Sequence, residues 1–226
     1  MTGPGAAISA PGLLFALLGA AALLTPFMTL AANRIVAGEG VMACGVASLP
    51  MVLPGLIAIG AGLVMGLPAG RNRLRTGGAV LGLGGLLWLL TQGASGLLVE
   101  AGEYARVSPS VGFWCLLIVF MLLMADALAA LAPGPLMRGG VLVAVLAVLG
   151  VILWSGALSD LSVMQEYASR ADAFGREFMR HLGLAFGSLA AAAVIGFPLG
   201  VLCHRLASLR GATLPVLSFL QTIPSL

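Results

Sequence analysis

The sequence predicts an all-α polytopic membrane protein, and two observations carry this prediction. First, 60% of the 226 residues are hydrophobic and only 8% are charged, with a mean hydropathy of +1.11. A chain of this composition has too little polar surface to cover a soluble globule. Second, long apolar runs alternate with short gaps that hold almost all of the charged residues. Asp126 is the one charged residue inside an apolar run.

Six apolar runs are long enough to cross a membrane, because a helix needs about 20 mainly apolar residues to span about 30 Å of hydrocarbon. They lie at residues 11–32, 50–68, 77–98, 112–132, 139–158 and 181–203. A seventh run begins at Gly211 and continues to Leu226. At 1.5 Å per residue it reaches only about 24 Å. We therefore expect six transmembrane helices and a truncated seventh.

The charged gaps predict the orientation of these spans. Three gaps hold arginines and no acidic residue: Arg71, Arg73 and Arg75, then Arg138, then Arg205 and Arg210. The other gaps mix five arginines with seven acidic residues, a net charge of 5 − 7 = −2. Basic residues in short loops stay on the cytoplasmic side. The acid-free gaps and the amino terminus are therefore predicted to be cytoplasmic, and the mixed gaps are predicted to face outward.

Residues 161–180 form the one amphipathic segment outside the predicted spans. Apolar residues recur there at steps of three and four, which indicates a helix, and Ser162 and Gln165 have the spacing of a capping box at its start. We predict one interfacial helix on the outer membrane surface that leads into the sixth span. It serves either as a solvated scaffold or as a docking surface for a partner outside the membrane.

Asp126 is the candidate functional residue within the membrane. A bare charge there costs about 2.5 to 3.5 kcal/mol on insertion scales, so an acidic residue at this depth needs a reason. Its alanine neighbours favour a tight helix interface, and Arg138 is near enough in sequence to pair with it. Substrate or proton handling by Asp126 is the other interpretation.

Small residues recur at four-residue spacing in several spans. The pairs are Gly62 with Gly66, Gly78 with Gly82, Gly183 with Gly187, and Gly196 with Gly200. Such pairs let helix backbones approach closely in lipid. We expect them to mark helix contacts, with sliding contacts in a transport cycle as the alternative.

Composition and motifs exclude several other classes. The net charge of +3 comes from the predicted cytoplasmic loops, so nucleic-acid binding is not expected. Three widely spaced cysteines indicate neither a disulfide framework nor a metal site. No phosphate-binding glycine loop of the Walker type is present, so this chain is expected to bind no cofactor itself and any ATP is used by a partner.

One short stretch raises the possibility of an enzyme. Residues 93–96 read Gly-Ala-Ser-Gly, which is similar to the nucleophile motif of the rhomboid family of intramembrane serine proteases, and Ser95 and His181 are predicted at a similar depth. The match is four residues long in a chain with 32 glycines, and the other motifs of that family are missing. We do not expect an enzyme.

From Phe174 onward the sequence resembles the permease subunits of binding-protein-dependent ABC importers. The resemblance is carried by residues 181–185 (HLGLA), 195–201 (IGFPLGV), the basic turn at 205–210, and 221–226 (QTIPSL). The last hexapeptide is similar to the osmoprotectant branch, which imports glycine betaine and choline. Residues 33–40 (NRIVAGEG) resemble the outer loop of those osmoprotectant permeases that carry a long multi-span amino-terminal extension.

The resemblance implies a division of labour among several chains. A soluble substrate-binding protein delivers the osmoprotectant outside, a second permease copy or paralogue completes the pore, and ATPase subunits drive transport from inside. The expected domains are a five-helix membrane extension (1–160), the interfacial helix (161–180) and the opening of the permease core (181–226). The expected location is the bacterial cytoplasmic (inner) membrane, which the chain crosses several times.

The resemblance also suggests where transport residues lie. Gln221, Thr222, Pro224 and Ser225 are the candidates for the translocation path, and helix-to-helix hydrogen bonding is their alternative role. Arg205 and Arg210 would lie in the loop that faces the ATPase. The competing function is a secondary transporter, outside the ABC class, that couples ion movement through Asp126.

Overall fold

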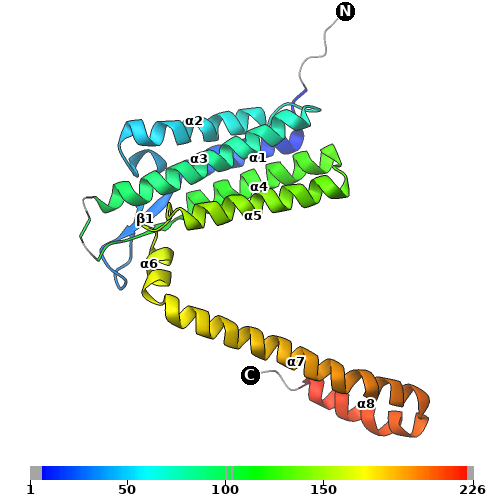
Figure 1. The fold of residues 1–226 in the computed structure, drawn as a ribbon. Helices are drawn as coiled ribbons and strands as arrows, with labels where there is room; N and C mark the ends of the chain where they lie inside the picture. Colours follow the sequence, from blue (N-terminus) through cyan, green and yellow to red (C-terminus); the bar gives the residue numbers. More distant parts are fainter. Residues whose placement is uncertain (1–6, 100, 103, 223–226) are drawn as a thin grey trace, which may run out of the picture. The chain divides into compact units, whose positions relative to one another are not determined.

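The computed structural model describes residues 7–99, 101–102 and 104–222, and it is mostly helical (Figure 1). Four of its helices are long and apolar enough to cross a membrane: α3 (Asn72–Leu98), α4 (Val111–Leu131), α5 (Pro135–Trp154) and α7 (Ala171–Arg205). They correspond to the last four predicted spans. A helical membrane protein is therefore confirmed. The chain divides into two compact units, residues 1–168 and residues 169–226.

The first two predicted spans are shorter helices in the structure. α1 (Ala10–Ala22) has 13 residues and α2 (Leu49–Met65) has 17. α1 ends ten residues before the apolar run does, because the chain turns at Thr25 and enters a strand at Met28. The helix α1 is therefore shorter than the apolar run at residues 11–32 predicts.

The helices α1 to α5 of the first unit alternate in direction between two ends. At one end, which we call the turn end, the start of α1 meets the end of α2, where the Ser9 N–H donates to the Leu67 carbonyl at 2.8 Å. The α2–α3 and α4–α5 turns lie at the same end (Figure 1). The opposite end, which we call the sheet end, carries three short strands. The acid-free gaps of this unit thus lie at the turn end, and the mixed gaps lie at the sheet end.

A three-stranded antiparallel sheet closes the sheet end, and the all-α prediction missed it. It consists of β1 (Met28–Ala31), β2 (Glu39–Val41) and β3 (Arg106–Pro109) in the order β2-β1-β3, followed after β2 by a short 3-10 helix, η1 (Ala43–Gly45). Met28 pairs with Val41 on one side and with Pro109 on the other. Met28 and Val107 are fully buried, so the sheet covers the apolar end of the bundle.

Glycines bring α2, α3 and α4 into close contact. A Cβ on Gly62 would lie 2.6 Å from the Gly78 carbonyl oxygen, and a Cβ on Gly82 would lie 2.1 Å from the Phe120 ring. Close helix packing is therefore confirmed for the glycine pairs of α2 and α3. In the second unit, no described atom lies within 4 Å of the corresponding positions at Gly183, Gly187, Gly196 and Gly200. The role of those four stays a prediction.

The interfacial helix predicted at 161–180 is wrong as one continuous element. The structure has α6 (Ser162–Ser169), a break at Arg170 with φ −131° and ψ 18°, and then α7. The start at Ser162 is correct, but no capping box forms among the described contacts, because the Ser162 hydroxyl donates to the Val107 carbonyl and the Gln165 amide to the Asp160 carbonyl. Tertiary contacts with the sheet replaced the local cap.

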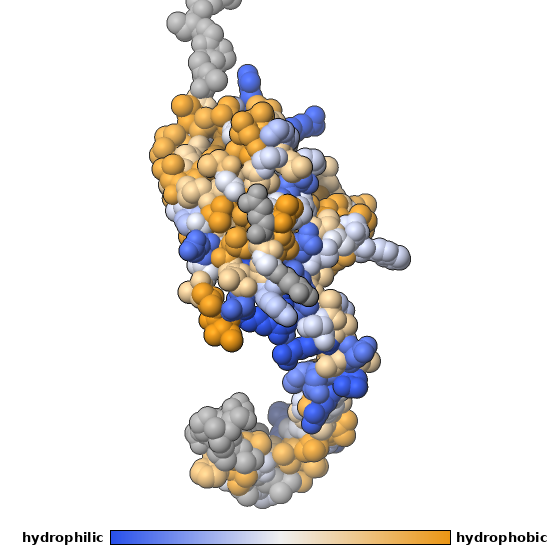
Figure 2. Space-filling model, turned by 90° about the vertical axis from the view of Figure 1, so that its left-hand side faces the viewer, coloured by the Kyte–Doolittle hydropathy of each residue, from blue (hydrophilic) through white to orange (hydrophobic). Residues whose placement is uncertain are grey.

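The second unit is a pair of helices. α7 has 35 residues, or about 52 Å, and runs through Pro198 to Arg205. After a break at Leu206, α8 (Ala207–Thr222) begins four residues before the predicted start at Gly211. The first ten residues of α7 are rich in charge, and the rest of that helix is apolar. Figure 2 shows hydrophilic and apolar residues gathered in separate stretches of this unit.

Candidate functional site

The charged groups at the turn end are joined by an ion pair between α3 and α4. Asp126 on α4 accepts a hydrogen bond from the Arg75 guanidinium on α3. Arg75 lies one turn into α3, and Asp126 lies about a turn and a half before the end of α4. Because the two helices are antiparallel, these positions fall at nearly the same depth.

Arg75 is held on two sides. Its Nε donates to the Gly66 carbonyl oxygen at 3.1 Å, at the end of α2, and its side chain is 5% exposed. The Asp126 side chain is 35% exposed. A Cβ on Gly12 of α1 would come within 2.3 Å of the same Gly66 oxygen. One guanidinium therefore ties α2, α3 and α4 together beside the start of α1.

The sequence-based partner of Asp126 is wrong. Arg138 does not pair with Asp126, since its Nε donates to the Pro133 carbonyl at 2.8 Å within the α4–α5 turn. Arg75 is the partner of Asp126 because its helix, α3, contacts α4 directly. Arg138 belongs to α5, which has no buried residue. The pairing favours a structural role for Asp126, and a role in transport stays a prediction.

A second set of contacts joins α6 to the sheet end. Leu161 is buried beside Val107 of β3, and the Ser162 hydroxyl donates to the Val107 carbonyl at 2.8 Å. The Arg106 guanidinium donates to the Gln165 side-chain oxygen. Arg34, from the β1–β2 connection, pairs with Glu166 at 2.9 Å. We call these contacts the α6 anchor. They fix the residues that immediately precede α7.

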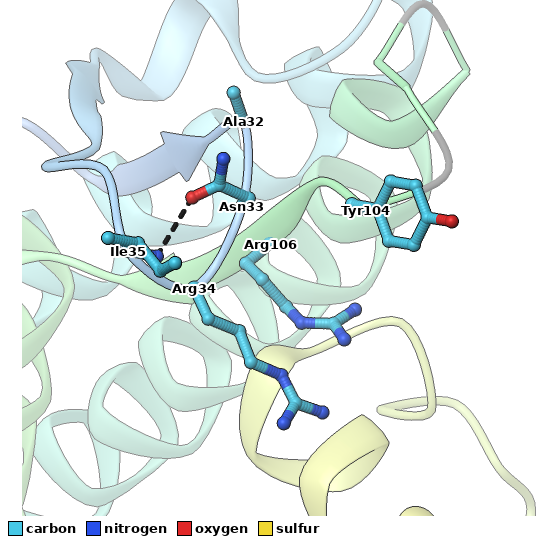
Figure 3. Close-up of a pocket in the computed structure, with 6 residues that line it drawn as sticks. All are labelled: Ala32, Asn33, Arg34, Ile35, Tyr104 and Arg106. Atoms are coloured by element: carbon cyan, nitrogen blue, oxygen red, sulfur yellow. Dashed lines mark hydrogen bonds between the residues drawn. The ribbon is translucent and has the colours of Figure 1, made fainter.

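An open hollow of about 340 Å³ lies beside the α6 anchor, lined by Ala32, Asn33, Arg34, Ile35, Tyr104 and Arg106. In Figure 3 the Arg34 and Arg106 side chains both point toward α6, and Asn33 turns back onto its own loop. Its side-chain oxygen accepts from the Ile35 and Val36 N–H groups at 2.8 and 3.0 Å. The loop that resembles the osmoprotectant permeases is therefore held in shape by Asn33.

In the α6 anchor, the hydrogen bond of the Ser162 hydroxyl should stabilise α6 more than the Arg34–Glu166 ion pair does. We expect Ser162→Ala to cost about 1 kcal/mol, because it leaves the Val107 carbonyl without this donor. Arg34→Ala should cost less, because both partners of that ion pair are about half exposed. Hydrogen exchange of the α6 amides measures both changes. Protection in Ser162→Ala as high as in the unchanged protein would show that the hydroxyl bond does not hold α6.

The predicted transport residues all belong to the second unit. Gln221 and Thr222 are at the end of α8, whereas Pro224 and Ser225 lie outside the described residues. Arg205 is the exposed last residue of α7, and Arg210 is in the first turn of α8. The two arginines therefore flank the α7–α8 turn. The role of the first four residues in transport and the role of the two arginines in ATPase contact stay predictions.

Ser95 and the possible metal ligands lie as follows among the described residues. They contain no group of three or more histidine, cysteine or acidic residues that could hold a metal ion. The Ser95 hydroxyl donates to the Thr91 and Gln92 carbonyls of its own helix, both at 3.2 Å. That geometry is typical of a helical serine in lipid.

Sequence reasoning missed Arg75 and the two side chains that hold α6, Arg34 and Arg106. Arg75 lies in an acid-free gap, and its depth near the start of one span matches that of Asp126 near the end of the next. That match in depth was readable from the sequence. The partners of Arg34 and Arg106 lie in a segment more than 50 residues further along the chain, and no local pattern indicates them.

Comparisons with known proteins identify the family. Residues 9–164, more than half of the chain, match the family described as "ABC transporter permease YehY, N-terminal domain". This range takes in the five-helix bundle, the sheet and most of the first turn of α6. The comparisons with curated proteins and with solved structures gave no significant match. The chain therefore belongs to the family of ABC transporter permeases that carry this amino-terminal domain.

Proposed function

We propose that this chain is part of the membrane permease of an ABC importer for osmoprotectants such as glycine betaine or choline. The observation that carries the proposal is the family match over residues 9–164, joined to permease-like motifs in residues 181–226. In this account residues 1–160 are a membrane extension, and residues 181–226 belong to the transport core.

The charge distribution is compatible with a substrate that carries a quaternary ammonium group. A fixed carboxylate on the translocation path would hold such a group too tightly. Residues 182–203 of α7 contain no charged residue, and Asp126 is neutralised by Arg75. Among the described residues, neither the helices α1 to α5 nor residues 182–203 of α7 therefore present an unpaired acidic side chain.

The proposed partners act at opposite sides of the membrane. The basic turn from Arg205 to Arg210 would face an ATPase in the cytoplasm, and the sheet end with the α6 anchor would face a substrate-binding protein outside. A second permease, either a copy or a paralogue, would complete the pore. The proposed setting is the bacterial cytoplasmic membrane, which the apolar helices suit.

Uptake by the whole transporter tests the substrate class. We expect proteoliposomes with the full permease, its ATPase and its binding protein to take up labelled glycine betaine or choline. An excess of the unlabelled compound should suppress uptake, and a neutral sugar should not. The same vesicles without the binding protein are the control. ATP-driven uptake of another compound class, with no uptake of quaternary amines, would overturn the substrate proposal and leave the permease assignment intact.

The runner-up, a secondary transporter coupled through Asp126, receives no support from the ion-pair geometry. The Arg75 guanidinium already pairs with the Asp126 carboxylate and ties it to α3 and to the end of α2, which suits a structural role. We therefore do not propose it.

A further inference from the structure

A second cavity lies at the turn end of the first unit. Its volume is about 550 Å³, and it is lined by Gly70, Arg71, Asn72, Arg73, Leu74 and Leu131. The lining comes from the α2–α3 turn, the start of α3 and the last residue of α4. Gly70 has φ +72°, a conformation that favours glycine and lets the chain turn tightly beside the cavity.

The described residues leave positive charge at this cavity without a partner. Arg75 is neutralised by Asp126, but the side chains of Arg71 and Arg73 form no hydrogen bond or ion pair with any described residue. Both are exposed. At the turn end, Asp126 is the only acidic residue in the described part of this unit. Two guanidinium groups therefore remain free to bind an anion from outside the chain.

The walls of the cavity are apolar as well as basic. Leu74 and the 39%-exposed Leu131 line it. A soluble anion would gain nothing from these apolar walls. A ligand with a charged head and an apolar body would contact both kinds of surface.

We propose that this cavity binds the phosphate headgroup of an anionic phospholipid from the leaflet at the turn end of the bundle. Arg71 and Arg73 would contact the phosphate oxygens, which planar guanidinium groups bind through paired N–H donors. The glycerol and the first acyl carbons would lie against Leu74 and Leu131. Basic pockets between membrane helices are suited to such headgroups. The proposal does not depend on the substrate or the direction of transport.

Lipid binding to the purified full permease tests this site. Vesicles of phosphatidylglycerol in a phosphatidylcholine background would be titrated, and native mass spectrometry or a fluorescent phosphatidylglycerol would report bound lipid. We expect Arg71→Gln with Arg73→Gln to weaken phosphatidylglycerol binding about 25-fold, since each basic residue at an anionic surface contributes about fivefold. Arg71→Lys with Arg73→Lys should retain more of the affinity, because the charge remains.

Arg138→Gln is the matched control, because Arg138 lies at the same end but does not line the cavity. Binding in this variant should stay close to that of the unchanged protein. An equal loss in both glutamine variants would mean a diffuse charge effect and would overturn the proposal. Binding of phosphatidylcholine with the same affinity would overturn it too. Displacement of the lipid by millimolar inorganic phosphate or ATP would assign the site to a soluble phosphate instead.

Discussion

Replacing Asp126 by alanine should destabilise the helix bundle of the first unit by about 3–5 kcal/mol, because it leaves a buried guanidinium without its counter-charge. Arg75 is 4% exposed and cannot turn to solvent without breaking its bond to the Gly66 carbonyl. Thermal unfolding of the purified permease, followed by circular dichroism, measures the loss. The same change should loosen the contact between α3 and α4, which trypsin cleavage at Arg75 would report.

A double variant separates charge pairing from packing. Arg75→Met with Asp126→Leu removes both charges together, and stability should recover most of what Asp126→Ala loses. Arg138→Ala is the control, because its side chain is exposed and bonds only to the Pro133 carbonyl among the described groups. A loss after Asp126→Ala no larger than that after Arg138→Ala would show that the ion pair does not hold the bundle.

Gly82→Ala should destabilise the bundle by about 1–3 kcal/mol, since a Cβ there would lie 2.1 Å from the Phe120 ring. Phe120 is fully buried, so its ring has no space to move into. Gly84→Ala is a matched control two residues away, where no described atom lies within 4 Å. Alanine favours a helix over glycine by about 1 kcal/mol, so Gly84→Ala should stabilise slightly.

The two alanine substitutions are expected to change stability in opposite directions, which separates two explanations. Helix propensity alone predicts that both stabilise, whereas close contact between α3 and α4 predicts that only Gly84→Ala does. Phe120→Leu should reduce the cost of Gly82→Ala, because a smaller side chain makes room for the new methyl group. Stabilisation by Gly82→Ala would show that α3 and α4 do not meet at this glycine.

The long helices were predictable because hydrophobic length is a local property of the sequence. The runs at 77–98 and 112–132 match α3 and α4 within a few residues at each end. The strands were not predictable in this way. β1 is four residues of an apolar run that also suits a helix. Pairing with β2 and with β3, the latter more than 70 residues away, fixes it as a strand.

In the candidate site, too, local features were predictable from the sequence and contacts between distant residues were not. Asp126 was predicted as a functional candidate from the free-energy cost of placing a charged side chain in lipid, which depends on that residue alone. Its partner depends on which helices touch, and 51 residues separate Asp126 from Arg75. The break at Arg170 also follows from tertiary contacts, because α6 is held against β3 by Leu161 and Ser162. The periodicity of residues 161–180 runs across that break without a change.

The energy source of transport tests most directly whether this chain is the permease of an ABC importer. Proteoliposomes would hold the full permease with its ATPase, with ATP sealed on the ATPase side and the binding protein on the other. We predict that uptake of labelled substrate requires ATP and continues after an uncoupler has collapsed the proton gradient. Uptake that ignores ATP and stops with the uncoupler would contradict the ABC assignment.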